Sequence, residues 1–460
     1  MKISLSWLQQ YLKVDLSTDE LSELLTDIGL EVEGIHKYET IKGGLKGIVI
    51  GKILTVDKHP DADRLNLTTV DVGTEDPLQI VCGAPNVAIG LNVPVATVGT
   101  RLYDGDESFK IKRSKIRGQI SNGMICGPDE IGLGPKTDGI MELPDDAEVG
   151  MAGANYFNIN EDIVFEIGLT PNRSDAMSHI GVARDLKAVL NSRGDDLKMC
   201  MPSIKDFKID NKDLTIDVKI ESESLCPRYS GVSISNVTVN ESPDWLKHKL
   251  LSIGINPINN IVDVTNYVLH ETGQPLHAFD TEKILGKEII VKTLSNDTNF
   301  ITLDESNRKL SDNDLMICNA KEPMCIAGVF GGLDSGVTNN TNSIFIESAY
   351  FDPTSIRKTA KYHKLNTDAS FRYERGCDPN ITVYALKRAA LLIQELCGGV
   401  ISSDVVDVYP NPIEDFSINF SFNNLNKLIG EELDRNLVKS IIKNLEIKII
   451  EENDDSLSLF

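Results

Sequence analysis

Five short runs rich in β-branched and apolar residues follow one another near the start of this chain. They cover residues 48–56, 65–72, 79–82, 93–98 and 110–116, and Gly, Pro or Asp residues separate them. Short strands at such spacing need one another to bury a face, so the series predicts a small closed barrel. The oligonucleotide-binding (OB) barrel is the economical form, because its sheet face and loops can carry nucleic acid.

The last of these runs also holds the sharpest change of charge in the chain. Residues 46–117 contain ten Lys and Arg against nine Asp and Glu, whereas the whole chain has 46 against 69 and a formal net charge of -23. Lys and Arg supply most of the sequence-independent affinity for nucleic acid. The alternative interpretation is the solvated face of one strand. The candidate RNA-binding residues are Lys110, Lys112, Arg113, Lys115 and Arg117.

Two motifs flank this basic run. His59-Pro60-Asp61-Ala62-Asp63-Arg64-Leu65 precedes it, and Ser121-Asn122-Gly123-Met124-Ile125-Cys126-Gly127 follows it. With Lys115-Ile116-Arg117-Gly118, they stand where the motifs of a known module stand. Residues 47–153 resemble the tRNA-binding domain that several translation proteins share, which implies an OB-fold and a tRNA partner.

Composition indicates a globular chain of several domains. It is 41% hydrophobic but has no apolar stretch of roughly 18 residues, so we expect no membrane span. The first residues lack the apolar run of a signal peptide, which favours a cytoplasmic protein. The eight cysteines contain no Cys-x-x-Cys pair, so we expect reduced, mostly buried thiols and no metal site.

We predict an α+β multidomain fold. Ser17 to Glu20 forms a capping box that begins a helix, residues 176–193 read as a second helix, and Leu437, Ile441 and Leu445 share one face of a third. Because the chain stops inside a predicted hairpin, we expect a fragment. The predicted parts are an N-terminal helical segment (1–39), an OB-fold tRNA-binding domain (40–155), a helical linker packing on the core (156–212), an editing domain of the B3/B4 type (213–400) and the start of a small helix/strand domain of the B5 type (401–460).

The densest polar patterns lie within residues 263–376. Each has an ordinary interpretation: His277 as a turn histidine bonded to backbone, and Gly331-Gly332 as a tight turn. Glu347 lies inside an apolar run, where a carboxylate is costly unless it has a partner. It is expected either to pair with an arginine or to face a ligand.

Taken together and in order, these patterns resemble the β subunit of bacterial phenylalanyl-tRNA synthetase from Met1 to the end of the chain. The resemblance implies an α2β2 heterotetramer in which the α subunit uses ATP and Mg²⁺ to charge tRNA(Phe). ATP and Mg²⁺ belong to the assembled enzyme, and no residue here is assigned to them, since the magnesium ligands would follow Phe460. Neither membrane nor DNA is an expected partner.

The same resemblance implies that this chain hydrolyses tyrosine wrongly attached to tRNA(Phe). Tyrosine differs from phenylalanine by one hydroxyl, which a site that hydrogen-bonds it can discriminate strongly. Glu347 is the candidate for that bond, and no general base is assigned. The other implied pocket residues are His277, Gly331, Thr367 and Ala369, with Thr265 and Asn266 on a helix beside them. The alternatives are a non-catalytic tRNA-binding scaffold and a free-standing editing enzyme.

Overall fold

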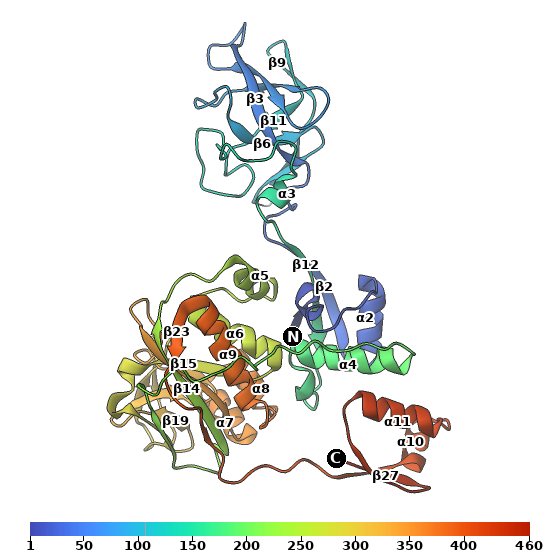
Figure 1. The fold of residues 1–460 in the computed structure, drawn as a ribbon, viewed down its shortest axis with the longest axis vertical. Coiled ribbons are helices and arrows are strands. Elements are labelled where there is room, and N and C mark those ends of the chain that lie inside the picture. The colour runs from blue at the N-terminus through green and yellow to red at the C-terminus, as the bar shows by residue number, and fades with distance from the viewer. Residues whose placement is uncertain (106) are drawn as a thin grey trace. The chain divides into compact units, whose positions relative to one another are not determined.

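A computed structural model describes residues 1–105 and 107–460 and shows a mixed α+β protein (Figure 1). The chain divides into two compact units. One consists of Met1–His36 together with Ile163–Phe460, and the other is Lys37–Asp162. Each unit has its own hydrophobic core.

The Lys37–Asp162 unit is built on a five-stranded antiparallel sheet in the order β11-β6-β3-β4-β5. Its first and last strands approach each other: the Asn122 N–H, just before β11, donates to the Gln79 carbonyl of β5 over 2.8 Å. The sheet is therefore a nearly closed barrel. Its strands are β3 (Ile48–Lys58), β4 (Asn66–Asp71), β5 (Leu78–Cys82), β6 (Asn92–Thr97) and β11 (Gly123–Ile125).

Four of the five predicted strands of this unit are confirmed, and the fifth is wrong as one element. Residues 110–116 are divided between β8 (Glu107–Lys110) and β9 (Ser114–Ile116). Ile111 lies between them and is buried, with its N–H bonded to the Thr100 carbonyl at 2.7 Å. That contact turns the chain inward and ends the strand. The remaining elements are β7 (Arg101–Asp104), which pairs with β8, β10 (Gln119–Ser121), which pairs with β9, and α3 (Gly153–Tyr156).

The N-terminal segment contains two strands beside its helices, which the sequence analysis does not predict. They join a three-stranded sheet in the order β1-β12-β2. The capping box is confirmed, because Ser17 and Glu20 bond each other's backbone N–H groups at the start of α2. The elements are β1 (Lys2–Ser4), α1 (Leu5–Leu8), α2 (Thr18–Asp27), β2 (Glu31–Glu39) and β12 (Glu161–Gly168).

An aromatic stack fixes this segment to the rest of its unit. The Trp7 ring lies between His179, with centroids 4.0 Å apart, and Tyr267, with centroids 4.5 Å apart. His179 belongs to α4 (His179–Ser192), which begins three residues later than the predicted helix. Residues Ser174–Ala176 form a 3-10 turn, and the extended Ser178 then caps α4 through its side chain.

Residues 213–408 contain two further sheets. One has the order β15-β22-β14-β23, with β24 also paired to β14, and the other has the order β13-β16-β19-β20-β21. The first consists of β14 (Arg228–Val237), β15 (Leu276–Asp280), β22 (Ser343–Tyr350), β23 (Gly398–Ile401) and β24 (Val406–Val408). The second consists of β13 (Asp217–Ile220), β16 (Glu288–Thr293), β19 (Leu315–Cys318), β20 (Pro323–Ile326) and β21 (Phe330–Gly331). A separate pair is β17 (Asn299–Ile301) with β18 (Asn307–Lys309).

Alternate residues of β22 enter two different cores, because successive strand side chains point to opposite faces. Ile344 and Ile346 pack in the core that includes α6 and α9. Phe345 and Ala349 pack in the core that includes the second sheet. The helices of these residues are α5 (Asp244–Ser252), α6 (Asn260–Thr272), α7 (Pro353–His363), α8 (Asp368–Tyr373) and α9 (Thr382–Cys397).

The last residues form a small sheet, in the order β25-β27-β26, with two helices. The final helix is confirmed, but the face that carries Leu437 and Ile441 is 41% and 37% exposed at these residues, whereas Val438 and Ile442 are buried. Val438 and Ile442 are the residues that pack in this small domain's own core. The elements are β25 (Ile418–Ser421), α10 (Phe422–Ile429), α11 (Arg435–Asn444), β26 (Ile449–Glu452) and β27 (Ser456–Leu459).

Candidate functional site

Glu347 lies in the middle strand of three, on the face of β22 that it shares with Phe345 and Ala349. The register places it opposite His277 of β15 on one side and Gly231 of β14 on the other. Its side chain is buried, and Phe345 and Ala349, on the same face of β22, are apolar and buried. A carboxyl in such a place needs a partner or a ligand.

The partner of Glu347 is Tyr229 of β14. The Tyr229 hydroxyl donates to Glu347 Oε2 over 2.9 Å. Within residues 1–105 and 107–460, no arginine or lysine forms an ion pair with Glu347. Burial therefore raises the pKa of the Glu347 carboxyl to about 8, and the Tyr229 hydrogen bond acts in the opposite direction. Of the two alternatives that the sequence leaves open, the arginine pair is not formed.

His277 is a strand residue rather than a turn residue. Its ring contacts Phe279 edge-on, with centroids 4.5 Å apart. The Nε2 atom is buried and has no hydrogen-bond partner. Burial lowers the pKa of His277 to about 4, so the imidazole is neutral around pH 7. An unpaired buried nitrogen of this kind is rare and is a candidate contact for a ligand.

Gly331 brings β21 against the same histidine. A Cβ atom added at Gly331 would lie 3.2 Å from His277 Cε1 and 2.8 Å from Leu303 Cδ1. Leu303 follows β17; its N–H donates to the Gly331 carbonyl over 3.0 Å, and its side chain remains 47% exposed. Leu303 thus covers the edge of the site. The sequence carried no signal for it, since an isolated leucine after a short strand has no distinctive pattern.

Thr367 and Ala369 come from the start of α8. Thr367 caps this helix in a capping box with Ser370, and its Oγ1 donates to the Val329 carbonyl over 3.0 Å, two residues before Gly331. Ala369 packs against the core that contains Tyr229 and Phe345. The structure therefore brings Thr367 and Ala369 to the same core as Glu347.

Thr265 and Asn266 belong to α6, which packs on the face of β22 opposite to that of Glu347. The apolar residues Val264 and Val268 of α6 share a core with Ile346. Thr265 Oγ1 donates to the Val262 carbonyl of its own helix over 2.7 Å. No hydrogen bond in the described part of the chain joins either side chain to Glu347 or His277.

The basic residues of the barrel unit form an exposed surface. Lys110 ends β8, Lys115 lies in β9, and all five predicted RNA-binding side chains are exposed. His59 connects the first motif to this surface, because its Nε2 contacts the Ile116 carbonyl at 3.2 Å and its Nδ1 accepts the Asp61 N–H at 3.0 Å. Two of the three segments that the sequence singles out are therefore neighbours in space.

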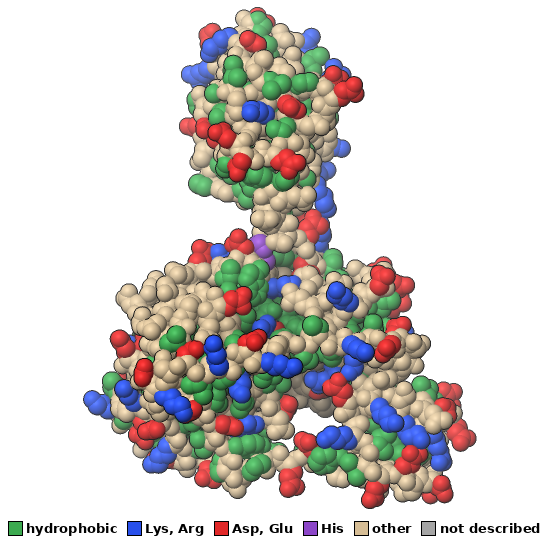
Figure 2. Space-filling view, viewed as in Figure 1, with side chains coloured by type: hydrophobic (Ala, Val, Ile, Leu, Met, Phe, Trp, Pro, Cys, Tyr) green, Lys and Arg blue, Asp and Glu red, His purple; other side chains and the backbone are tan. Residues whose placement is uncertain are grey.

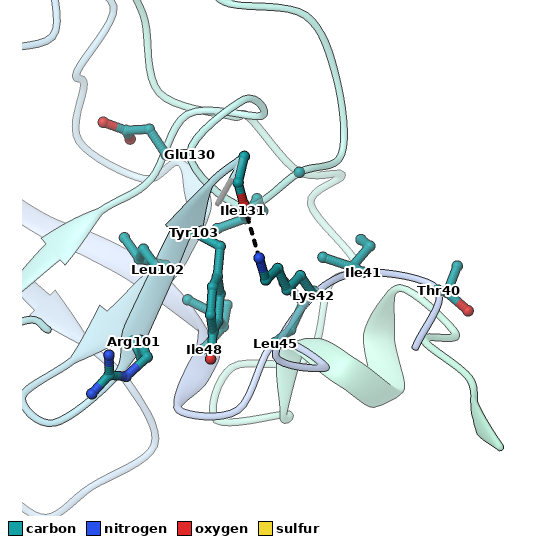
Figure 3. A pocket seen from close by; sticks show the side chains of 12 residues that line it. Thr40, Ile41, Lys42, Leu45, Ile48, Arg101, Leu102, Tyr103, Glu130 and Ile131 are labelled. Atoms are coloured by element: carbon teal, nitrogen blue, oxygen red, sulfur yellow. Dashed lines mark hydrogen bonds between the residues drawn. The ribbon is translucent and has the colours of Figure 1, made fainter. Parts of the chain in front are cut away.

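The same unit has a cavity of about 310 Å³ beside β7 (Figure 3). Lys42 Nζ donates to the Gly105 carbonyl over 3.0 Å and lies 5.7 Å from the centroid of the Tyr103 ring. Arg101 and Glu130 line the same cavity. The sequence motifs gave no indication of it.

Four further observations concern charge, metal-binding groups, cysteines and membrane-spanning helices. On the face seen in Figure 2, Lys and Arg side chains are interspersed with Asp and Glu. Among the side chains that the structure describes, no group of three or more His, Cys, Asp or Glu residues could hold a metal ion. All eight cysteines are free thiols and six are buried. No helix in the described ranges is both long and apolar enough to cross a membrane.

Comparison with known proteins finds a family model for each of these two regions of the chain. Residues 48–152 match the family model of a putative tRNA binding domain, and residues 225–398 match that of the B3/4 domain. The phenylalanine–tRNA ligase beta subunits of Bacteroides fragilis strain YCH46 and Bacteroides thetaiotaomicron are 54% and 55% identical to this chain over 459 residues. The chain belongs to the phenylalanine–tRNA ligase beta-subunit family.

The chain covers only part of its relatives. The matches include 100% of this chain but 56% of the length of each of these relatives. The same shares apply to a beta subunit from Porphyromonas gingivalis that is 52% identical to this chain. Among solved structures, an N-terminal fragment of the phenylalanyl-tRNA synthetase beta subunit from Pyrococcus horikoshii aligns with 65% of this chain and 81% of its own. That likeness has 14% identity and a TM-score of 0.30, which is too weak to carry an argument.

Proposed function

We propose that this chain binds tRNA(Phe) through its barrel unit and hydrolyses tyrosine that has been wrongly attached to that tRNA. The proposed hydrolytic site comprises Glu347, His277 and Gly331, which are neighbours in the structure. The assembled protein is a cytoplasmic phenylalanine–tRNA ligase, in which an α subunit charges the tRNA with ATP and Mg²⁺ in an α2β2 complex. The family membership of the chain supports this assignment.

The observation that carries the proposal is a pair of buried polar groups on neighbouring strands that the described part of the chain leaves incompletely hydrogen-bonded. Glu347 has a hydroxyl partner but no cation, and His277 Nε2 has no partner at all. Protein cores usually satisfy such groups, because an unsatisfied one costs about 1–3 kcal/mol. A bound substrate that offers a phenol hydroxyl and an ester or ribose group would satisfy both.

The chemistry required of the site is modest. Water attacks the ester carbonyl, the tetrahedral intermediate collapses, and the ribose hydroxyl leaves with a proton. An aminoacyl ester is already activated, so holding the water and ester in position supplies much of the rate. The neutral His277 can hold water or a ribose hydroxyl through Nε2, and Glu347 holds the phenol hydroxyl. No step runs through a metal.

The exposed cations within residues 110–117 support the tRNA-binding part of the proposal. Lys110, Lys112, Arg113, Lys115 and Arg117 are exposed and can meet phosphate groups, which provide affinity without sequence specificity. The overall charge of -23 disfavours indiscriminate binding of RNA elsewhere on the surface. Docking is therefore expected at this surface.

The decisive experiment measures the release of amino acid from tRNA(Phe) charged with tyrosine or with phenylalanine. We expect the chain to release tyrosine and Glu347→Ala to lose roughly 10-fold to 100-fold of that preference, the value of a hydrogen bond to a buried charged group. Glu395→Ala is the matched control, because Glu395 is exposed on α9. Equal tyrosine release by wild type and Glu347→Ala would exclude Glu347 from the site, and no release by either, with or without the α subunit, would leave a tRNA-binding scaffold as the function.

The dependence of tyrosine release on the α subunit distinguishes the assembled ligase from a free-standing editing enzyme. Tyrosine release by the chain alone, with no gain on adding the α subunit, would indicate a free-standing editing enzyme. Release that appears only with the α subunit would assign the activity to the assembled ligase.

A further inference from the structure

Tyr229 makes the only side-chain hydrogen bond of Glu347 in the described parts of the chain. Both side chains are buried, at 0% and 4% exposure. The bond occupies Glu347 Oε2, and Oε1 has no hydrogen-bond partner within those residues. The carboxyl is therefore held at one oxygen and free at the other.

The strand pairing places different groups on the two sides of Glu347. On the β14 side, Gly231 lies opposite Glu347, and the Phe345 ring fills the space that a side chain would take, since a Cβ at Gly231 would be 2.1 Å from Phe345 Cζ. On the β15 side stands His277 with its unpaired Nε2.

We propose that Tyr229 is a positioning residue of this site: it holds Oε2 of Glu347 so that Oε1 remains the acceptor for the para-hydroxyl group of a bound phenolic side chain. This inference rests on the function proposed above. It assigns a role to a residue that contacts neither the ester nor the attacking water, and it gives a reason for the buried hydrogen bond between Tyr229 and Glu347.

The surroundings make the charge state of Glu347 sensitive to this bond. Burial raises the pKa of the carboxyl to about 8, and the Tyr229 hydrogen bond opposes that rise. The other titratable groups near it do not change charge between about pH 6 and pH 9. Burial raises the pKa of Cys226, Cys325, Tyr229 and Tyr373 well above their ordinary values and lowers the pKa of His277 to about 4.

The ionised carboxylate is the stronger acceptor, because charge-assisted hydrogen bonds are roughly twice as strong as neutral ones. The preference for a tyrosyl over a phenylalanyl ester is therefore expected to rise as the pH passes about 8. Without the Tyr229 hydroxyl, the pKa of Glu347 rises further. The increase in preference then moves to higher pH.

The test compares the full chain with Tyr229→Phe, Glu347→Gln and the double variant. Release of tyrosine and phenylalanine from charged tRNA(Phe) is followed between about pH 6 and pH 9. We expect Tyr229→Phe to lower the tyrosine preference at pH 8 about 10-fold, to move its rise upward in pH, and to leave phenylalanine release unchanged. In the Glu347→Gln background, Tyr229→Phe should add nothing. An unchanged preference and pH profile in Tyr229→Phe would overturn the proposal.

A second readout does not depend on hydrolysis. The carboxyl carbons of glutamate labelled with carbon-13 are titrated by NMR, and the Glu347 signal is identified by its loss in Glu347→Gln. A higher midpoint in Tyr229→Phe supports the positioning role, and an identical midpoint rejects it. If wild type releases neither amino acid, the proposed function fails, while this titration still decides the role of Tyr229. Near-ultraviolet circular dichroism verifies that each variant is folded.

Discussion

At the scale of single residues, the burial of Glu347 provides a binding group but lowers the stability of the folded protein when the carboxyl is ionised. Its folded pKa of about 8 exceeds the ordinary 4.5, so the folded state holds a proton that the unfolded state releases. Glu347 therefore does not destabilise the fold below about pH 4.5, and its buried charge lowers the free energy of unfolding as the pH rises to about 8 and above. Glutamine keeps an acceptor for Tyr229 but does not ionise.

We therefore predict that Glu347→Gln is more stable than wild type at pH 8–9, by on the order of 2–4 kcal/mol, and that the gain shrinks toward pH 5. Thermal denaturation at a series of pH values measures this difference. Glu395→Gln, on the exposed side of α9, should show no such trend. A gain that is the same at every pH would mean that the carboxyl is not buried as described.

Gly331 sets the space beside His277. The atom nearest to an added Cβ, at 2.8 Å, belongs to the half-exposed Leu303 side chain, which can move aside, whereas the His277 ring at 3.2 Å lies in the site. We predict that Gly331→Ala changes the free energy of unfolding by less than about 1 kcal/mol but lowers tyrosine release at least about 10-fold. Gly336→Ala is the control, because its added Cβ would contact Leu303 at 3.8 Å. Equal losses in the two variants would contradict a local steric effect.

At the scale of elements, the short helix α8 depends on its N-cap residue, Thr367. The Thr367 hydroxyl caps the helix and also bonds to the Val329 carbonyl near Gly331. We predict that Thr367→Ala lowers stability by about 1 kcal/mol, the usual value of an N-cap, and reduces tyrosine release. Thr367→Ser keeps the hydroxyl and should retain both properties. Denaturant unfolding and ester hydrolysis measure the two effects, and loss of activity in the serine variant would point to the methyl group instead.

The basic segment that runs from the end of β8 through β9 allows a second test at this scale. We predict that changing Lys112, Arg113 and Lys115 together to Ala weakens tRNA binding and reduces the slope of log affinity against log salt by about 2, since each lost phosphate contact removes about 0.7 to 0.9 of slope. Three exposed cations of the other unit, Lys198, Lys205 and Lys208, provide the control. Filter binding at several salt concentrations gives both slopes, and equal slopes would remove β9 from the RNA surface.

Elements also show how far sequence patterns reach. Alternation and turn residues predicted β3, β4, β5 and β6, and a side-chain cap predicted α2, because these signals are local. The division of residues 110–116 was not predictable, since it follows from the contact of Ile111 with Thr100. For the site, Glu347 was identifiable as a carboxyl in an apolar strand. Tyr229 was not, because the register of β14 against β22 decides which residue reaches that carboxyl.

At the scale of the whole molecule, the chain crosses between its two units twice, at His36/Lys37 and at Asp162/Ile163. The crossing strands β2 and β12 are neighbours in one sheet, so the two junctions lie close together. Each unit also contains its own buried core, with Trp7, Phe165 and Phe345 in one and Val70 and Val95 in the other. An insertion of this kind can be removed without opening the core that remains.

We predict that replacing Lys37–Asp162 by a short Gly/Ser linker leaves a folded protein whose thermal transition matches that of the same unit in the intact chain. Its tyrosine release at saturating charged tRNA should be kept, because Glu347, Tyr229 and His277 all belong to the retained unit, while its tRNA affinity and salt slope should fall. Residues 37–162 expressed alone should carry the lost salt slope. If removing the barrel instead abolishes hydrolysis at every tRNA concentration, the barrel contributes to presenting the ester and not to affinity alone.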